Sequence, residues 1–413
     1  MPAAPPAYDL AIAGAGPGGA ACAAFAARAG LRVLLVDKAP AFPRDKICGD
    51  ALSGKTVDVM KRLGMTAALQ ARPQVASWGV TFSGPYGDAV SIPFAPEAHA
   101  GKDAPGYVCD RATFDALVLE EALAAGAELW TGASVTGLVR EGAAVRGLRV
   151  RRGGEETDVR AALTVGADGA YSAVARALGI PQLDERHYCA GLRWYWEGVQ
   201  GFGEGNYIEI HFVDEAIPGY FWIFPMAGGR ANVGLGMLSS EVKRRGVRLK
   251  PLLEQVVASE RFRERFAGGR PLEPMRGWGL PLGSKPRPMT GDGWLLVGDA
   301  AGLIDPFTGE GIGNAMVSGE IAARWAARVA ATGDASARHL SGYRRDVLGY
   351  LGSELRVSHA LQKLGQRKRL LNFVIARAAR RPAVAEAISV MFHDEAARKK
   401  LFNPLFYLRL LRT

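Results

Sequence analysis

A glycine-rich turn near the start of the chain has the residue spacing of a dinucleotide site. Gly14, Gly16 and Gly19 follow a short apolar segment, and Asp37 closes the next one, "LRVLLVD". The first glycine permits a tight turn, the second lets backbone approach a pyrophosphate, and the third lets a helix pack closely on a strand. The phosphates would lie at the amino end of that helix. Because Asp37 could accept hydrogen bonds from a ribose diol, the motif predicts FAD or NAD.

A second segment that could do chemistry is "RDKICGDAL", residues 44–52, which places cations, a thiol and a carboxylate in one loop. The residue types allow a metal site, a thiol nucleophile or a loop over a cofactor. No histidine or second cysteine lies near Cys48 in the sequence, so we expect no metal. The simplest role for the thiol is that of a small buried apolar group.

Two aspartates farther along the chain stand where a predicted strand gives way to a helix. Asp168 follows "LTVGA" and Asp299 follows "GWLLVG", and each could cap the helix behind it. With the glycine turn, they resemble the DG and GD signatures of flavoproteins of the aromatic-hydroxylase type, and Arg111 resembles the arginine that heads a helix near FAD. The resemblance implies FAD as cofactor. It also implies that the helix after "DPFTGEGIGNA" directs its positive end at the flavin pyrimidine.

The segments between Asp168 and Asp299 predict a separate antiparallel sheet. "HYCAGLRWYWEGV", "NYIEIHFVDE", "GYFWIFPMAGGR" and "ANVGLGML" alternate in polarity and are separated by turn residues. In "GYFWIFP", Tyr220, Trp222 and Phe224 share one face and Phe221 and Ile223 the other. Both faces are apolar, so the strand should be covered on both sides, by core packing or by a ligand.

The composition is that of a large globular enzyme. The chain has 413 residues, 48% apolar and 22% charged, with a formal net charge of +10. This length predicts two intertwined domains. The charge favours phosphorylated small molecules or anionic lipid, and no nucleic-acid motif accompanies it. Four dispersed cysteines, and the lack of a signal peptide or an 18-residue apolar run, predict a cytoplasmic protein.

Two segments narrow the resemblance to one family. "PRDKICGDALS", residues 43–53, is similar to the PxxKxCGxxLS loop of the geranylgeranyl reductase family, and "GYFWIFP" with Gly234 and Gly236 resembles its YxWxFP motif. The motifs keep the family order over residues 8–330. Asp50 departs from the pattern, because many members have a second glycine there.

The resemblance implies a mixed α/β (α+β) fold: a Rossmann-like FAD-binding domain, an inserted antiparallel-sheet substrate domain and a helical C-terminal region. We place the first at residues 1–75, 105–180 and 285–335, the second at 76–104 and 181–284, and the third at 336–413. The residues expected to bind FAD are Gly14, Gly16, Pro17, Gly19, Asp37, Lys38, Arg44, Cys48, Gly49, Arg111, Val135, Asp168, Gly169, Asp299, Pro306, Gly309, Gly311 and Ile312.

The implied activity is saturation of C=C bonds in an isoprenoid lipid or prenyl diphosphate. Hydride would come from N5 of reduced FAD, and an acid or a water would protonate the other carbon. The catalytic residues implied are Tyr220, Trp222 and Phe224, which would line the prenyl cavity, where ring faces attract positive charge, and Cys48 and Gly49, which would lie at the flavin ring. The Cys48 thiol could donate the proton or shape the cavity. No second GxGxxG is evident, so an external donor, NADPH or ferredoxin, is expected.

Two other functions are compatible with the fold. A flavin monooxygenase or halogenase shares it, but the halogenase motif Gly-x-Trp-x-Trp-x-Ile-Pro is not matched at Tyr220 and Phe224. A non-catalytic prenyl carrier would have no need of a redox flavin site.

The C-terminal region is expected to be helical from about Leu351. Its apolar stripe comprises Val357, Leu361, Leu364, Leu371 and Ile375, and Lys363, Arg367, Lys368 and Arg369 lie largely off it. The tail "LFNPLFYLRLLRT" again mixes apolar residues with arginine. The pattern fits either a helical cap on the core or a basic amphipathic surface on the membrane.

Overall fold

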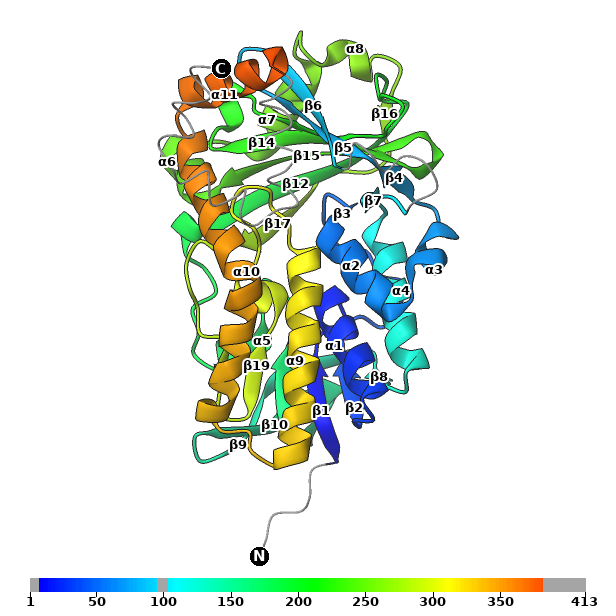
Figure 1. Ribbon diagram of the computed structural model, residues 1–413, viewed down its shortest axis with the longest axis vertical. Coiled ribbons are helices and arrows are strands. Elements are labelled where there is room, and N and C mark those ends of the chain that lie inside the picture. The colour runs from blue at the N-terminus through cyan, green and yellow to red at the C-terminus, as the bar shows by residue number, and fades with distance from the viewer. Residues whose placement is uncertain (1–6, 95–102, 382–413) are drawn as a thin grey trace, which may run out of the picture.

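The computed structural model describes residues 7–94 and 103–381. Its lower half in Figure 1 contains a sheet in which β1 lies between β2 and β11, parallel to both. The central strands β1 and β2 are buried on both faces, which explains their apolar runs. The strands of this sheet are β1 (Tyr8–Ala13), β2 (Val33–Val36), β8 (Glu128–Trp130), β9 (Ala133–Glu141), β10 (Ala144–Arg152), β11 (Glu155–Gly166), β18 (Thr290–Gly291) and β19 (Trp294–Leu296).

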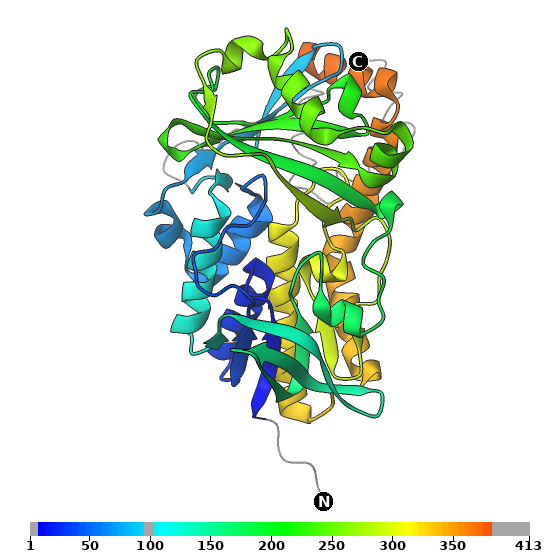
Figure 2. The ribbon, with the colours of Figure 1, turned by 180° about the vertical axis from the view of Figure 1, so that it is seen from behind.

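Long helices cover this sheet and meet near the glycine-rich turn. Helix α1 (Pro17–Arg28) packs against both α4 (Arg111–Ala124) and α9 (Ile312–Thr332). Figures 1 and 2 show α10 (Ala337–Gly365) running alongside α9 toward the upper half. Shorter helices are α2 (Gly54–Leu63), α3 (Thr66–Gln70), α5 (Ala173–Ala177) and α11 (Lys368–Arg380). The C-terminal helices begin earlier than the predicted Leu351, because Ser336 caps α10 by accepting a hydrogen bond from His339 N.

The upper half is a second sheet, and it is not wholly antiparallel. The order is β16, β12, β15, β14, β13, β5 and β6, with β17 also paired to β12. Strand β5 runs parallel to β13, because it enters from the cofactor domain rather than through a hairpin. The strands are β5 (Gly79–Ser83), β6 (Ala89–Pro93), β12 (Tyr188–Glu197), β13 (Ile208–His211), β14 (Gly219–Met226), β15 (Arg230–Leu238), β16 (Arg270–Pro271) and β17 (Arg276–Pro281).

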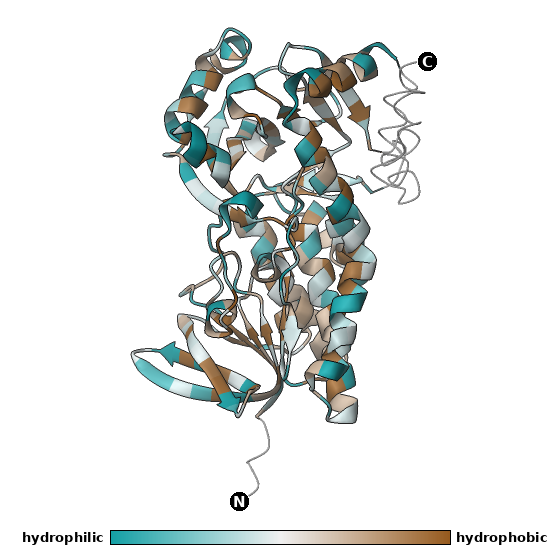
Figure 3. Cartoon of the chain, turned by 90° about the vertical axis from the view of Figure 1, so that its left-hand side faces the viewer, coloured by the Kyte–Doolittle hydropathy of each residue, from teal (hydrophilic) through white to brown (hydrophobic). Residues whose placement is uncertain are grey.

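The outer face of the second sheet is covered by α7 (Leu249–Ala258) and α8 (Arg263–Phe266), with α6 (Ser239–Arg245) at its end. Phe221 and Ile223 pack there with Leu253 and Phe266 in one apolar core. A small sheet of β3 (Ala51–Leu52), β4 (Val75–Ser77) and β7 (Gly106–Val108) joins the two halves. In Figure 3 the hydrophobic colour concentrates on the interior strands. Among the described residues, no helix is long and apolar enough to span a membrane.

Candidate functional site

A large cavity extends between the two sheets. Its volume is about 1610 Å³, which exceeds the roughly 300–1,000 Å³ of a pocket for one drug-sized ligand. The lining runs from the Gly14 turn, past Cys48 and the Tyr220 face of β14, to apolar side chains of β5, β6, β13 and α11. The cavity therefore has room for a dinucleotide and an elongated apolar ligand.

The fold brings nearly all of the predicted site residues to this cavity. Of the residues named above for FAD and catalysis, Gly19 alone is not in its lining. A Cβ at Gly19 would lie 1.9 Å from the Gly14 carbonyl oxygen, so this glycine lets α1 pack against the turn rather than contact a ligand. That these lining residues bind FAD stays a prediction, and it is supported by the helix ends and the cations that lie at the cavity.

The amino ends of two helices lie at the cavity. Gly16 precedes α1 and Gly311 precedes α9, and no side chain caps either helix. Uncapped first turns carry free N–H groups at the positive end of the helix dipole. Asp37 fixes the turn before α1, accepting hydrogen bonds from Ala15 N and Ala39 N, each 2.8 Å long. The two helix ends fit the pyrophosphate and the electron-rich pyrimidine edge of FAD.

Buried cations surround the same end of the cavity. The Arg44 Nε atom is buried and, within the described part of the chain, has no hydrogen-bond partner. Arg111 donates to the Asp115 carboxylate through Nε and Nη2, at 2.6 and 2.9 Å. Burial lowers the pKa of Arg111, but the charges of Asp115 and Cys48 outweigh it and raise the pKa overall. Burial lowers the pKa of Lys46 to about 8. Arg44 Nε lies 4.0 Å from Asp37 Oδ1, an ion pair without a hydrogen bond, so its N–H group, together with Lys46 and Arg111, suits an anionic ligand.

The two signature aspartates differ in their surroundings. Asp168 holds the start of α5, accepting from Ser172 Oγ at 2.5 Å and Ala173 N at 2.6 Å, so it has the helix-capping role while it borders the cavity. Burial raises the pKa of Asp299, against the opposing charges of Lys46 and Arg111. Asp299 also borders the cavity.

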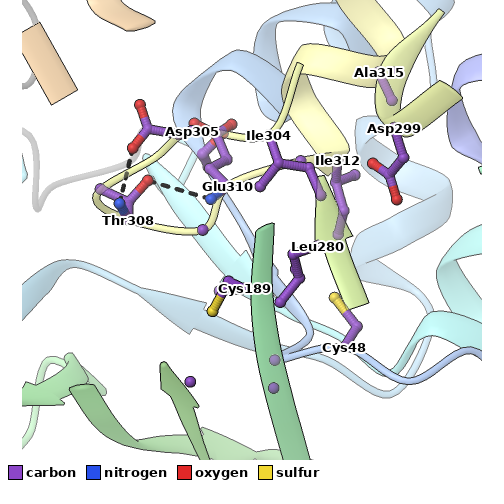
Figure 4. Close-up of a pocket in the computed structure, with 18 of the residues that line it drawn as sticks. Cys48, Cys189, Leu280, Asp299, Ile304, Asp305, Thr308, Glu310, Ile312 and Ala315 are labelled. Atoms are coloured by element: carbon purple, nitrogen blue, oxygen red, sulfur yellow. Dashed lines mark hydrogen bonds between the residues drawn. The ribbon is translucent and has the colours of Figure 1, made fainter. Parts of the chain in front are cut away.

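The Cys48 loop lies against the aromatic face of β14. In Figure 4 Cys48 lies on one side of the pocket, with Ile304, Ile312 and Asp299 on the other. A Cβ at Gly49 would lie 3.1 Å from Phe224 Cε2, so glycine is what permits this close contact. Asn232 on β15 connects the Cys48 loop to β14 by hydrogen bonds. It accepts one from Trp222 Nε1 and donates one to the Cys48 carbonyl, both at 2.8 Å.

Several side chains of this site were not identified from the sequence. Asn232 is a lone amide in the apolar strand "ANVGLGML", a pattern that could have suggested a buried polar contact. Lys55 on α2 contacts Glu310 and Glu354 at 2.9 and 2.7 Å. No local pattern predicts that contact, because its members come from three separate segments.

The apolar stripe of the C-terminal helices faces the cavity. Val357, Leu361, Leu364, Leu371 and Ile375 all line it. Of the basic residues beside the stripe, Lys368 forms an ion pair with Asp214 on the second sheet domain. The described part of the C-terminal region thus packs as a cap on the core. The tail "LFNPLFYLRLLRT" lies outside the described residues.

The fold and the site define a flavoprotein of the FAD-binding type. Residues 7–349 match a family model described as an FAD binding domain. The chain is 31% identical over 343 residues to a digeranylgeranylglycerophospholipid reductase of Thermoplasma acidophilum, which covers 82% of both proteins. It is 33% identical over 321 residues to a menaquinone reductase of Mycolicibacterium smegmatis, covering 76% of this chain and 75% of the relative. The chain belongs to the geranylgeranyl reductase family of FAD-dependent oxidoreductases.

Solved structures agree with this family. A geranylgeranyl bacteriochlorophyll reductase-like protein of Thermoplasma acidophilum superposes with a TM-score of 0.82 at 25% identity, over 96% of this chain and 98% of that one. A flavin-dependent brominase also superposes, with a TM-score of 0.78 at 21% identity, over 96% of this chain and 98% of that one. The second likeness extends to the fold alone.

Proposed function

We propose that the protein saturates C=C bonds of an isoprenoid chain that lies in the cavity beside FAD. The observation that carries this proposal is the continuity of the cavity, from the glycine-rich turn through the Tyr220, Trp222 and Phe224 face to an apolar end at α11. A cavity of about 1610 Å³ with an apolar end has room for a prenyl chain beside FAD. The named relatives act on lipids with isoprenoid chains, which supports an isoprenoid lipid or prenyl diphosphate as substrate.

FAD, when bound and reduced, supplies hydride at N5. The uncapped end of α1 would hold its pyrophosphate, Asp37 its ribose, and the end of α9 its pyrimidine. The chain's own contribution is to hold the alkene in a water-poor cavity and to stabilise positive charge on it. The ring centroids of Tyr220 and Trp222 are 6.0 Å apart and those of Trp222 and Phe224 are 6.2 Å apart. These neighbouring rings provide faces that attract a cationic carbon.

The direct test is anaerobic incubation of dithionite-reduced holoenzyme with geranylgeranyl diphosphate, followed by mass spectrometry. We expect products heavier by two hydrogens for each bond reduced, together with oxidation of the flavin. Oxygen-dependent hydroxylated or halogenated products, with no hydrogenated ones, would favour the monooxygenase or halogenase alternative and overturn the proposal.

Val374→Trp should separate long from short substrates. Val374 on α11 lines the far end of the cavity, and an overpacked side chain typically costs about 1–3 kcal/mol. We expect kcat/KM for geranylgeranyl diphosphate to fall roughly 10- to 100-fold, with little change for the shorter geranyl diphosphate. The control is Phe373→Trp, because the neighbouring Phe373 is exposed and outside the lining. Equal losses for both substrates would contradict this placement of the chain.

The electron donor and a contact with the membrane are further parts of the proposal. An external donor, NADPH or ferredoxin, would reduce the flavin. Basic residues of the C-terminal region would bring the protein to anionic lipid, where its substrate resides. Co-sedimentation with acidic vesicles that weakens as salt rises would support that contact, and retention by neutral vesicles alone would contradict it.

A further inference from the structure

The carboxyl group of Asp50 is buried at the border of the cavity. Asp50 has no exposed surface and a left-handed backbone, with φ +66°. Its Oδ2 atom accepts two hydrogen bonds, from the Tyr195 hydroxyl at 2.6 Å and from Asn232 Nδ2 at 2.8 Å. Its Oδ1 atom is buried and has no hydrogen-bond partner among the residues that the structure describes.

These contacts determine where a proton on Asp50 would sit. The Arg193 Nη1 atom donates to the Tyr195 hydroxyl oxygen at 3.1 Å, which directs the hydroxyl proton to Asp50. Arg193 is itself held by Asp45 and Glu273, at 2.9 and 2.6 Å. Oδ2 already accepts two hydrogen bonds from its neighbours. An acidic proton on Asp50 therefore belongs on Oδ1, the oxygen without a hydrogen-bond partner among the described residues.

Asp50 also adjoins the place where an alkene would lie. The Asn232 side chain that donates to Asp50 accepts from Trp222 Nε1, and Gly49, the preceding residue, contacts the Phe224 ring. One amide therefore links the carboxyl to the aromatic face of the cavity.

Burial of Asp50 favours a partly neutral acid at physiological pH. Burial raises the pKa of Asp50 to about 7, although the bonds from Tyr195 and Asn232 and the charges of Arg193 and Arg111 oppose the rise. Two thiols lie in the same surroundings: burial, helped by the charge of Asp50, raises the pKa of Cys109, at the end of β7, and Cys48 acts on the same Tyr195 and Arg111 side chains. An acid is most effective in catalysis when its pKa lies near the working pH.

We propose that Asp50 is the catalytic acid that protonates the alkene. The inference rests on the proposed function. As the O–H bond at Oδ1 breaks, the π electrons of the C=C bond form a C–H bond to that proton, and positive charge develops on the second carbon. That carbon receives hydride from reduced FAD, so the alkene gains two electrons and the flavin loses two. The Asp50 carboxylate regains a proton from solvent after the product leaves.

The test compares wild type with Asp50→Asn in single turnovers. Asparagine accepts a left-handed backbone, and its amide oxygen can accept the two bonds that Asp50 Oδ2 accepts, but it has no acidic proton. Reduced holoenzyme is mixed anaerobically with geranylgeranyl diphosphate, and flavin oxidation is followed by absorbance. We expect a rate constant about 10²- to 10⁴-fold lower in the variant, with unchanged FAD content. In wild type the rate should fall as pH rises through about 7, and the variant should lack this dependence.

Tyr195→Phe tests the same role through the pH at which the rate falls. A purely structural role of Asp50 would not move that pH. The bond from the Tyr195 hydroxyl holds the pKa of Asp50 down, so its removal should raise that pKa and move the fall in rate to higher pH. Infrared difference spectra of the holoenzyme without substrate should show a carboxylic acid band that disappears over the same pH range and is absent in Asp50→Asn.

The outcomes separate the two proposals. Wild type that does not reduce the prenyl substrate overturns the proposed function, and the inference with it. Wild type that reduces it while Asp50→Asn keeps the same rate and the same pH dependence overturns the inference alone. An infrared band that titrates only in the ordinary range of an aspartate would also overturn it.

Discussion

Replacing Gly19 with alanine should yield protein that purifies without FAD and unfolds at a lower temperature than wild type. The added Cβ would lie 1.9 Å from the carbonyl oxygen of Gly14, and this neighbour is backbone that cannot rotate away. Either α1 must move from the strand or the turn must open, and both changes displace the helix end that would bind the pyrophosphate. The flavin-to-protein absorbance ratio and the thermal unfolding midpoint measure the two effects.

Two other glycines provide controls for this substitution. At Gly16 the nearest atom to an added Cβ is the flexible Arg44 Nη2, 3.4 Å away. We expect Gly16→Ala to fold normally but to bind FAD more weakly, because the methyl group enters the space for the pyrophosphate. At Gly268 nothing lies within 4 Å, so Gly268→Ala should match wild type. Full FAD occupancy in Gly19→Ala would show that the turn does not hold the cofactor.

Replacing Lys55 with methionine should be the most destabilising change of a single charge considered for this protein. Lys55 Nζ lies 2.9 Å from Glu310 and 2.7 Å from Glu354, and it donates to Asn314 Oδ1 at 2.8 Å. The contacts join α2, the segment before α9, and α10. The three side chains are only 15–19% exposed, so the loss should approach the roughly 3–5 kcal/mol that removing one partner of a buried ion pair costs, because the remaining charge is left uncompensated. The midpoint of urea unfolding, followed by circular dichroism, would report this loss.

The loss should depend on pH in a defined direction. Burial and the charge of Glu354 raise the pKa of Glu310, while Lys55 opposes that rise. Without Lys55 the pKa of Glu310 must rise further. A carboxyl with a raised pKa in the folded state is destabilising when it ionises, so the deficit should grow as pH increases and shrink as it falls.

Arg62→Met is the matched control on the same helix. Arg62 pairs with Glu320 at 2.7 Å, but its side chain is 42% exposed, and surface ion pairs contribute about 0–1 kcal/mol. Similar midpoints for Lys55→Met and Arg62→Met would contradict the role assigned to the buried cluster.

Asp50, Gly19 and Lys55 act on different steps. We predict that the glycine turn decides whether FAD is present, that the Lys55 cluster holds the helices around it, and that Asp50 acts only once substrate is bound. Measuring FAD content, stability and single-turnover rate on each variant therefore separates cofactor loss from unfolding and from loss of chemistry.

The sequence alone determined the local features of this protein. The Gly14 turn, the strand ending at Asp37 and the two faces of β14 follow from glycine spacing and side-chain periodicity, which depend on neighbouring residues only. Tertiary structure decided what those features contact. The apolar stripe that contains Leu361 and Ile375 lines the cavity. From the sequence alone, the same stripe could equally have faced a membrane.

The same holds for the charged groups. The sequence placed Asp50 beside Cys48 but left its charge without a role, because its environment is built from Tyr195 and Asn232 on other strands. Likewise, Lys55 meets Glu310 and Glu354 only after distant helices pack. Burial and partners set the pKa of a carboxyl or an amine, and both depend on contacts between segments far apart in the chain. A local pattern carries no record of such contacts, so the protonation state of Asp50 is a property of the folded protein.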